Sequence, residues 1–143
     1  MATSLVLTAG CTRGKPPAVT TGPQSPPGWE VRYNATIALA RRGSPHIKDE
    51  PVWEVLLEML DEGQQLRNFR HKVKERGNIE VADDGNAYLT IITALQAIGE
   101  LHKQKPDLDL SGLYPAIEKL TRSPNAAANT EAKRIQQLLA IKK

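Results

Sequence analysis

Asp107 opens a segment whose residue types and spacing match a calcium-binding loop. Four oxygen-bearing side chains make the match: Asp107, Asp109, Ser111 and Glu118. Such loops place oxygen ligands at alternate positions, turn sharply at a glycine, here Gly112, and end on a bidentate glutamate. Leu108 and Leu110 stand at positions that are usually solvated, and Pro115 stands at a ligand-bearing position. We therefore interpret the segment as a loop leading into a helix, and keep the calcium site as the weaker alternative.

A second candidate site is a basic cluster with one aromatic residue inside it. Its members are Arg67, Phe69, Arg70, Lys72, Lys74 and Arg76. Closely spaced cations of this kind can bind an acidic protein, anionic lipid headgroups or nucleic acid. Acidic residues follow within 75–84, and cations also suit the carboxyl end of a helix, so a solvated helix end is the alternative. We treat the cluster as a candidate partner-binding surface.

Catalytic and metal-binding patterns do not otherwise stand out in the sequence. The three histidines, His46, His71 and His102, lie far apart and have no neighbours at the spacing of a metal site. We expect all three at the surface. No Ser-His-Asp, Cys-His or paired-carboxylate arrangement is apparent. We therefore predict a non-catalytic protein without a cofactor.

Charge and composition narrow the class of protein further. The chain has 143 residues and a formal net charge of +3. All 16 acidic residues lie at position 30 or later, where they meet 17 of the 19 cations. A nearly neutral domain argues against nucleic acid as the partner. No apolar run approaches the roughly 18 residues of a membrane-spanning helix, and a single cysteine allows no internal disulfide.

The N-terminal segment differs in composition from the rest of the chain. Residues 12–28 hold five of the ten prolines and three of the ten glycines, and they contain no acidic residue. Such a stretch cannot bury enough apolar surface to offset the entropy lost on ordering. We therefore predict a disordered linker over residues 12–29.

Cys11 stands immediately before this linker and follows small residues. The preceding tetrapeptide, 7–10, reads Leu-Thr-Ala-Gly, and with Cys11 it resembles the lipobox of bacterial lipoproteins. The resemblance implies a signal segment over 1–11, acylation of Cys11 and a place in the bacterial cell envelope, anchored to a membrane by lipid. No Lys or Arg precedes Cys11, although signal peptides begin with basic residues. The alternative is a cytoplasmic protein in which Cys11 is a lone thiol.

Residues 30–143 have the periodicity of amphipathic helices. Apolar residues recur at helical spacing in five segments: 31–42, 51–60, 87–104, 113–120 and 129–139. The predicted buried face of the first helix consists of Val31, Ala35, Ala38 and Leu39. Gly43 predicts its end, since glycine suits the left-handed position after a helix. Residues 78–82 alternate at period two but are short and flanked by charge, so we predict no strand.

The predicted helices repeat in pairs. The pattern of Ala38, Leu39 and Gly43 returns 56 residues later at 94–99, and 56–60 matches 116–120. Residues 31–43 resemble the first helix of HEAT repeats of the phycobilisome-lyase-like type, and 52–60 resemble the second helix. The resemblance is good over 31–60 and partial over 87–121. It implies an all-α domain over 30–143, a short α-α solenoid of about two and a half HEAT-like helix pairs.

The resemblance also carries an expectation about function. HEAT arrays generally work as scaffolds or binding modules, so it implies a non-catalytic, monomeric module that binds a protein of unspecified identity. The alternative is a bilin-lyase-like enzyme or enzyme subunit, by analogy with the lyases that carry such repeats. Because a helix pair cannot bury its apolar face alone, neighbouring pairs must share a core. The predicted core consists of Leu39, Val55, Leu56, Leu60, Ile91, Leu95, Ile98, Ile117 and Ile135.

Overall fold

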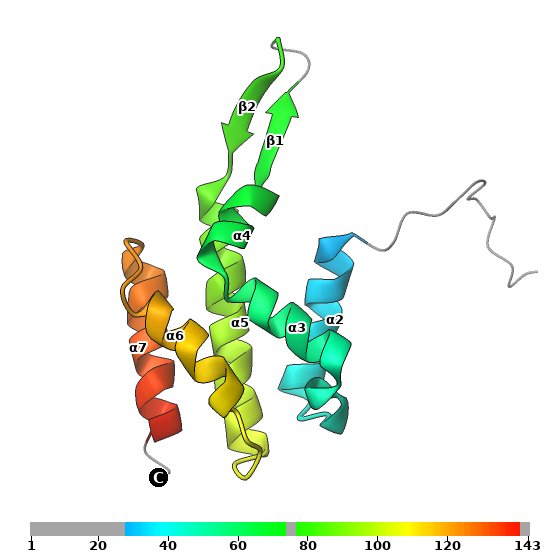
Figure 1. Ribbon diagram of the computed structural model, residues 1–143, viewed down its shortest axis with the longest axis vertical. Helices are drawn as coiled ribbons and strands as arrows, with labels where there is room; N and C mark the ends of the chain where they lie inside the picture. Colours follow the sequence, from blue (N-terminus) through cyan, green and yellow to red (C-terminus); the bar gives the residue numbers. More distant parts are fainter. Residues whose placement is uncertain (1–27, 74–76, 141–143) are drawn as a thin grey trace, which may run out of the picture.

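The computed structural model describes residues 28–73 and 77–140 (Figure 1). Within these ranges the fold is mostly helical, with six α-helices and a small β-hairpin. The elements are α2 (Trp29–Arg41), α3 (Glu50–Met59), α4 (Glu62–Asn68), β1 (Arg70–Val73), β2 (Ile79–Ala82), α5 (Asp84–Gln104), α6 (Tyr114–Leu120) and α7 (Ala126–Ala140). Short 3-10 turns at Pro45–Lys48 and Ser111–Leu113 precede α3 and α6.

Three helices lie side by side, and the others cross over them. α5 contacts α2 on one side and α7 on the other, so it is the centre of the molecule (Figure 1). α3 packs across α2 and α5, α4 packs against α5, and α6 packs against α7. The core lies between these layers, where Leu56, Leu95, Ile98 and Ile135 are completely buried. Long-range apolar burial of this kind is the main favourable term in the stability of the domain.

The helix ends follow from local residue chemistry. Gly43 has a φ of 64° and ends α2 in a Schellman motif, in which the Ser44 amide donates to Leu39 O and the Gly43 amide donates to Ala40 O. Asp83 caps α5, because its Oδ1 accepts from the Asn86 amide at 3.1 Å. The end of α2 agrees with the sequence prediction, whereas α5 begins at Asp84, three residues before its predicted segment.

The predicted buried face of α2 is wrong. Val31, Ala35 and Ala38 are exposed and Leu39 is only partly buried, whereas the buried side chains are Tyr33, Thr36, Ile37 and Ala40. At about 100° of rotation per residue, the predicted and the observed buried faces lie on nearly opposite sides of the helix. The prediction favoured apolar residues, but the buried face contains a tyrosine whose hydroxyl is satisfied by partners from other helices. Those partners cannot be identified from the periodicity of α2 alone.

The all-α prediction is also corrected between residues 62 and 85. This stretch is not a plain connection but contains α4 and the hairpin β1–β2. The strands are antiparallel, with Arg70 opposite Ala82 and Lys72 opposite Glu80. The alternation over 78–82 is therefore a real strand signal. The partner strand β1 was not predicted, because it contains cations of the basic cluster. Such cations are unusual in a strand interior but acceptable in an exposed hairpin.

Two smaller predictions differ from the structure. α7 begins at Ala126 rather than near residue 129, because the Asn125 side chain accepts from the Ala128 amide at 3.0 Å and caps the helix earlier. His102 is buried at 7% exposure on α5, although all three histidines were expected at the surface. Eight of the nine predicted core residues are buried, and Leu39 packs against the core while partly exposed.

Candidate protein-interaction site: the hairpin and its base

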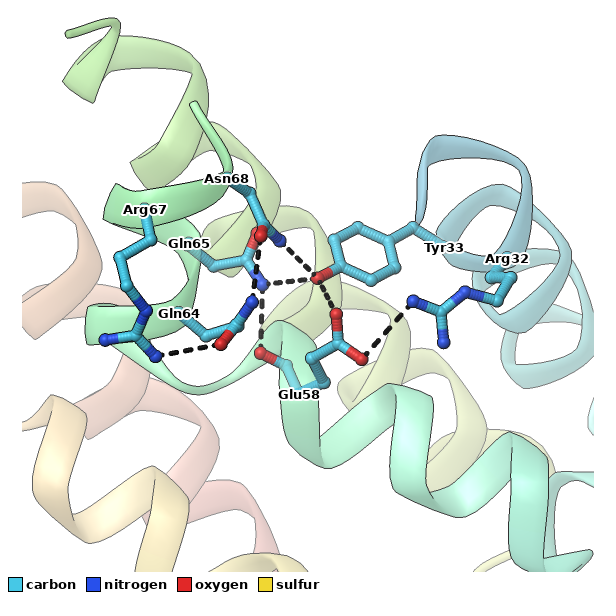
Figure 2. A network of polar contacts seen from close by, with 7 residues as sticks. All are labelled: Arg32, Tyr33, Glu58, Gln64, Gln65, Arg67 and Asn68. Atoms are coloured by element: carbon cyan, nitrogen blue, oxygen red, sulfur yellow. Dashed lines mark hydrogen bonds and ion pairs between the residues drawn. The ribbon is translucent and has the colours of Figure 1, made fainter. Parts of the chain in front are cut away.

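A polar network centred on Tyr33 lies at the junction of α2, α3 and α4, the helix that leads into β1 (Figure 2). The Tyr33 hydroxyl donates to Glu58 Oε1 at 2.6 Å and accepts from Gln65 Nε2 at 2.8 Å and Asn68 Nδ2 at 2.9 Å. Gln65 Nε2 also donates to the Glu58 carbonyl at 2.9 Å, and Arg32 lies 3.6 Å from the second oxygen of Glu58. One phenol therefore joins α2, α3 and α4.

Burial keeps the Tyr33 hydroxyl protonated to a higher pH than that of an exposed tyrosine. Tyr33 is 3% exposed, and its burial, followed by its hydrogen bond to Glu58, raises the pKa of the hydroxyl to about 12. Gln65 is completely buried, and its Oε1 has no hydrogen-bond partner among the described residues. The phenol therefore stays neutral and donates to the carboxylate over the whole physiological pH range. These contacts make the network a structural clamp.

An aromatic cluster extends the clamp to the first strand. The centroid of the Trp29 ring lies 5.2 Å from that of Tyr33 and 4.8 Å from that of Phe69. The Trp29 and Phe69 rings are arranged edge to face. Phe69 is the residue directly before β1, and its carbonyl accepts from the Asp83 amide at 3.0 Å. Aromatic pairs of this geometry contribute about 0.5–1.5 kcal/mol beyond area burial. Phe69, which the sequence placed in the partner-binding cluster, is therefore partly used in fixing the hairpin to α2.

The strands project away from the helices, and their two faces differ in chemistry (Figure 1). Opposed residues of an antiparallel pair share a face, so Arg70, Lys72, Glu80 and Ala82 lie on one face. His71 and Val81 are paired on the other face, together with Ile79. Ile79 is 54% exposed and Val81 is 38% exposed. The hairpin thus presents one charged face and one face rich in exposed apolar surface.

The structure brings the described members of the basic cluster together around this hairpin. Arg67 lies in the last turn of α4 and donates to Gln64 Oε1 at 2.8 Å, while Arg70 and Lys72 lie on the charged face of β1. Arg70 lies 3.9 Å from Glu80 across the strands, and both side chains are about half exposed. Lys74 and Arg76 lie outside the described residues. Sequence reasoning missed Tyr33, Gln65, Ile79 and Val81, of which the last two carried a weak period-two signal.

The calcium-loop residues have other partners. The Asp109 carboxylate accepts from the Ser111 amide at 2.9 Å, and hydrogen bonds from Ser111 lower the pKa of this carboxyl. Lys48 Nζ donates to the Asp109 carbonyl at 3.0 Å, which places a cation beside the loop. Glu118 pairs with Arg122 at 3.1 Å, and Asp107 is exposed. Within 28–73 and 77–140, no group of three or more acidic, histidine or cysteine side chains could hold a metal ion.

Two further features lie apart from the hairpin. A hollow between α6 and α7 is lined by apolar and polar side chains that include Tyr114, Ile117, Gln136 and Leu139. The predicted lipidation site Cys11 lies outside the described residues. Among the helices of the described part of the chain, none combines the length and apolarity that crossing a bilayer requires.

No family model, curated protein or solved structure matches this chain.

Proposed function

We propose that this chain is a non-catalytic, monomeric protein-interaction module of the HEAT-like type, which binds its partner through the hairpin β1–β2. The observation that carries the proposal is the projecting hairpin, whose described side chains are all exposed and include Ile79 and Val81. A two-stranded hairpin is at best marginally stable alone. Exposed apolar side chains on such an element are more readily explained by a partner that covers them than by the fold.

The helices supply a rigid frame for this arm. The alternation of α2, α5 and α7 in one layer with α3 and α6 in the other supports an array of about two and a half HEAT-like pairs. In that array α4 and the hairpin occupy the connection between the first and second pairs. The clamp at Tyr33 and the contact between Trp29 and Phe69 fix the start of β1 to this frame. Fixing the arm in advance reduces the entropy that binding must overcome.

The proposal is tested by site-specific photo-crosslinking in the native host. A photoreactive amino acid is introduced at Ile79 or Val81 on the hairpin, and at the exposed Gln96 or Lys133 as matched helical controls. The expected result is one discrete adduct from both hairpin positions and none from the controls. Equal labelling from hairpin and control positions, or no protein adduct from the hairpin, would contradict a hairpin-mediated interaction.

The Cys11 tether belongs to the same proposal. Its support is the lipobox resemblance together with the proline-rich segment that follows the cysteine. Wild type and Cys11→Ser are expressed from the native upstream region, then compared by intact mass and detergent-phase partitioning. Cleavage before Cys11, added acyl mass and detergent partitioning in the wild type alone would place the module in the bacterial envelope. Uncleaved, aqueous protein in both cases would mean that the partner is cytoplasmic.

A further inference from the structure

The hydrogen-bond ladder defines which backbone groups of the hairpin remain open. The Asp83 amide donates to the Phe69 carbonyl, in register with the strand pairs, so Phe69 and Asp83 form a hydrogen-bonded pair. Hydrogen-bonded and non-hydrogen-bonded pairs alternate along an antiparallel ladder. Arg70 with Ala82 and Lys72 with Glu80 are therefore non-hydrogen-bonded pairs. Their N–H and C=O groups point outward, to the two free edges of the hairpin.

The two edges differ in charge. The outer edge of β1 offers the backbone groups of Arg70 and Lys72, and the same residues place cations on the charged face. The outer edge of β2 offers those of Glu80 and Ala82. Arg70 already has the Glu80 carboxylate 3.9 Å away on its β2 side. On its open side, a carboxylate at the same cross-strand position would be equally favourable.

We propose that an acidic, extended segment of a partner protein pairs with the free edge of β1 as a third strand. Residues of that segment opposite Arg70 and Lys72 would be Asp or Glu. The residues between them would be apolar and would lie beside His71, extending the face that carries Ile79 and Val81. Main-chain hydrogen bonds supply affinity in such strand addition, and alternate side chains supply specificity. This inference rests on the proposed function and adds the chemistry and geometry of the partner.

Other occupants fit the edge less well. Antiparallel pairing of β1 with β1 of a second copy would bring Arg70 and Lys72 against the same cations of the other chain, and like charges directly opposite are destabilising. A membrane surface would satisfy the cations and apolar side chains but would leave the open N–H and C=O groups without partners in the apolar region. A protein strand can pair with the cations, cover the apolar side chains and bond to the open N–H and C=O groups at once.

The test uses the full chain and a fluorescent peptide of alternating glutamate and valine, measured by fluorescence anisotropy. In antiparallel pairing with β1, the glutamates opposite Arg70 and Lys72 form the hydrogen-bonded pairs, so their N–H groups bond to β1 and the valine N–H groups point away. N-methylation of the glutamates should therefore abolish binding, while N-methylation of the valines should preserve it. A lysine-valine peptide and a scrambled glutamate-valine peptide are expected not to bind. Equal binding of both N-methylated peptides, or of the scrambled peptide, would overturn strand addition.

Protein variants test the edge independently. The double variant Arg70→Glu/Lys72→Glu should weaken binding of the acidic peptide by about tenfold or more, and should gain binding of the lysine-valine peptide. The matched control Lys119→Glu/Lys133→Glu changes the net charge equally at exposed positions of α6 and α7 and should bind as the wild type does. The gain of the lysine-valine peptide shows that the hairpin of the variant is still formed.

The remaining outcomes separate this inference from the proposed function. If Ile79 and Val81 crosslink to a protein but no acidic peptide binds, hairpin-mediated binding stands and the acidic third strand is wrong. Binding instead to vesicles of phosphatidylglycerol, lost in the double variant, would assign the edge to a lipid surface. Sedimentation that shows concentration-dependent dimers, abolished in the double variant, would assign it to a second copy. Each of the last two results overturns the inference.

Discussion

Tyr33 joins three helices through one hydroxyl group, so its removal should be costly. Tyr33→Phe leaves Asn68 Nδ2 and Glu58 Oε1 without their partner while preserving the ring that packs on Trp29. A buried polar group that loses its partner costs about 1–3 kcal/mol, and the lower end of this range applies because Glu58 and Asn68 are only partly buried. We expect a loss of that size in the free energy of unfolding, measured by urea denaturation. Tyr114→Phe, at an exposed position, is the control, and an equal effect of both variants would contradict the clamp.

The same hydroxyl gives stability a defined dependence on pH. The pKa of Tyr33 is raised to about 12 from 10.0. Between these values the unfolded chain has lost the proton and the folded protein retains it, so the contribution is complete below pH 10 and falls as pH rises through the window. The stability advantage of wild type over Tyr33→Phe should therefore shrink above about pH 10. The urea midpoints of wild type and Tyr33→Phe are measured between about pH 8 and pH 12, where the lysines titrate equally in both proteins. If the difference between the two midpoints is unchanged at about pH 12, this linkage is excluded.

At this scale the sequence predicted the end of α2 but not the clamp. Gly43 acts within a few residues of its own position, so local spacing was sufficient to assign it. Gln65 is completely buried beside Tyr33, which lies 32 positions earlier in the chain. Nothing in the residues adjacent to a glutamine indicates a partner at that separation. A long-range polar contact therefore becomes visible only when the helices are assembled.

The end of α2 depends on a glycine conformation that other residues adopt at a cost. Gly43 has a φ of 64°, and a Cβ added there would lie 2.9 Å from Gln104 Oε1. Gly43→Ala should lower stability by about 1–2 kcal/mol, because an L side chain is strained in the left-handed region. Gly63→Ala, inside α4 where a Cβ meets atoms no closer than 3.4 Å, should raise stability by about 0.5–1 kcal/mol. Thermal denaturation measures both, and shifts of the same sign would contradict this account.

The hairpin should be separable from the helical domain. Its described side chains are exposed, and beyond its own two strands it contacts chiefly α4. Replacing residues 71–81 by a short glycine-serine linker should change the free energy of unfolding by about 0.5 kcal/mol or less, as for other exposed surfaces. Far-UV circular dichroism during urea denaturation checks this. A large loss of stability would mean that the hairpin is part of the fold rather than a binding arm.

Elements were predictable where apolar periodicity was strong. α3, α5 and α6 carry regular apolar spacing; α3 and α6 begin and end within one residue of their predicted segments, and α5 begins three residues early. α4 was missed because its seven residues contain a single large apolar side chain, and its burial depends on Gln65. β1 was missed because Arg70 and Lys72 interrupt the usual composition of a strand. The alternating cations made β1 difficult to recognise as a strand. The same cations form the edge that we propose pairs with an acidic partner.

At the scale of the whole molecule, α5 couples the two ends of the domain. It contacts α2 and α7 on opposite sides, and a Cβ added at Gly99 would lie 2.9 Å from Ile135 Cδ1, so α5 and α7 pack closely there. In longer repeat arrays stability is roughly a sum over neighbouring units. Here α5 packs against both α2 and α7, so a loss of stability at one end of the domain should lower the stability of the other end. We therefore expect the Tyr33 clamp to lose stability when the packing of α7 is disturbed.

Substitution of Ile135 tests this coupling. Ile135→Ala removes a completely buried side chain from α7 and should cost about 2–5 kcal/mol. The chain has two tryptophans, and the Trp53 ring lies beside Gly112 in the turn before α6, so only Trp29 on α2, measured in a Trp53→Phe background, reports the other end of the domain. If α5 transmits the loss, the urea midpoints by fluorescence and by circular dichroism should fall together. Gln136→Ala, at an exposed position of α7, is the control and should leave both midpoints unchanged. If the fluorescence midpoint of Ile135→Ala stays at the wild-type value, the two ends unfold independently, and the hairpin is held by α2, α3 and α4 alone.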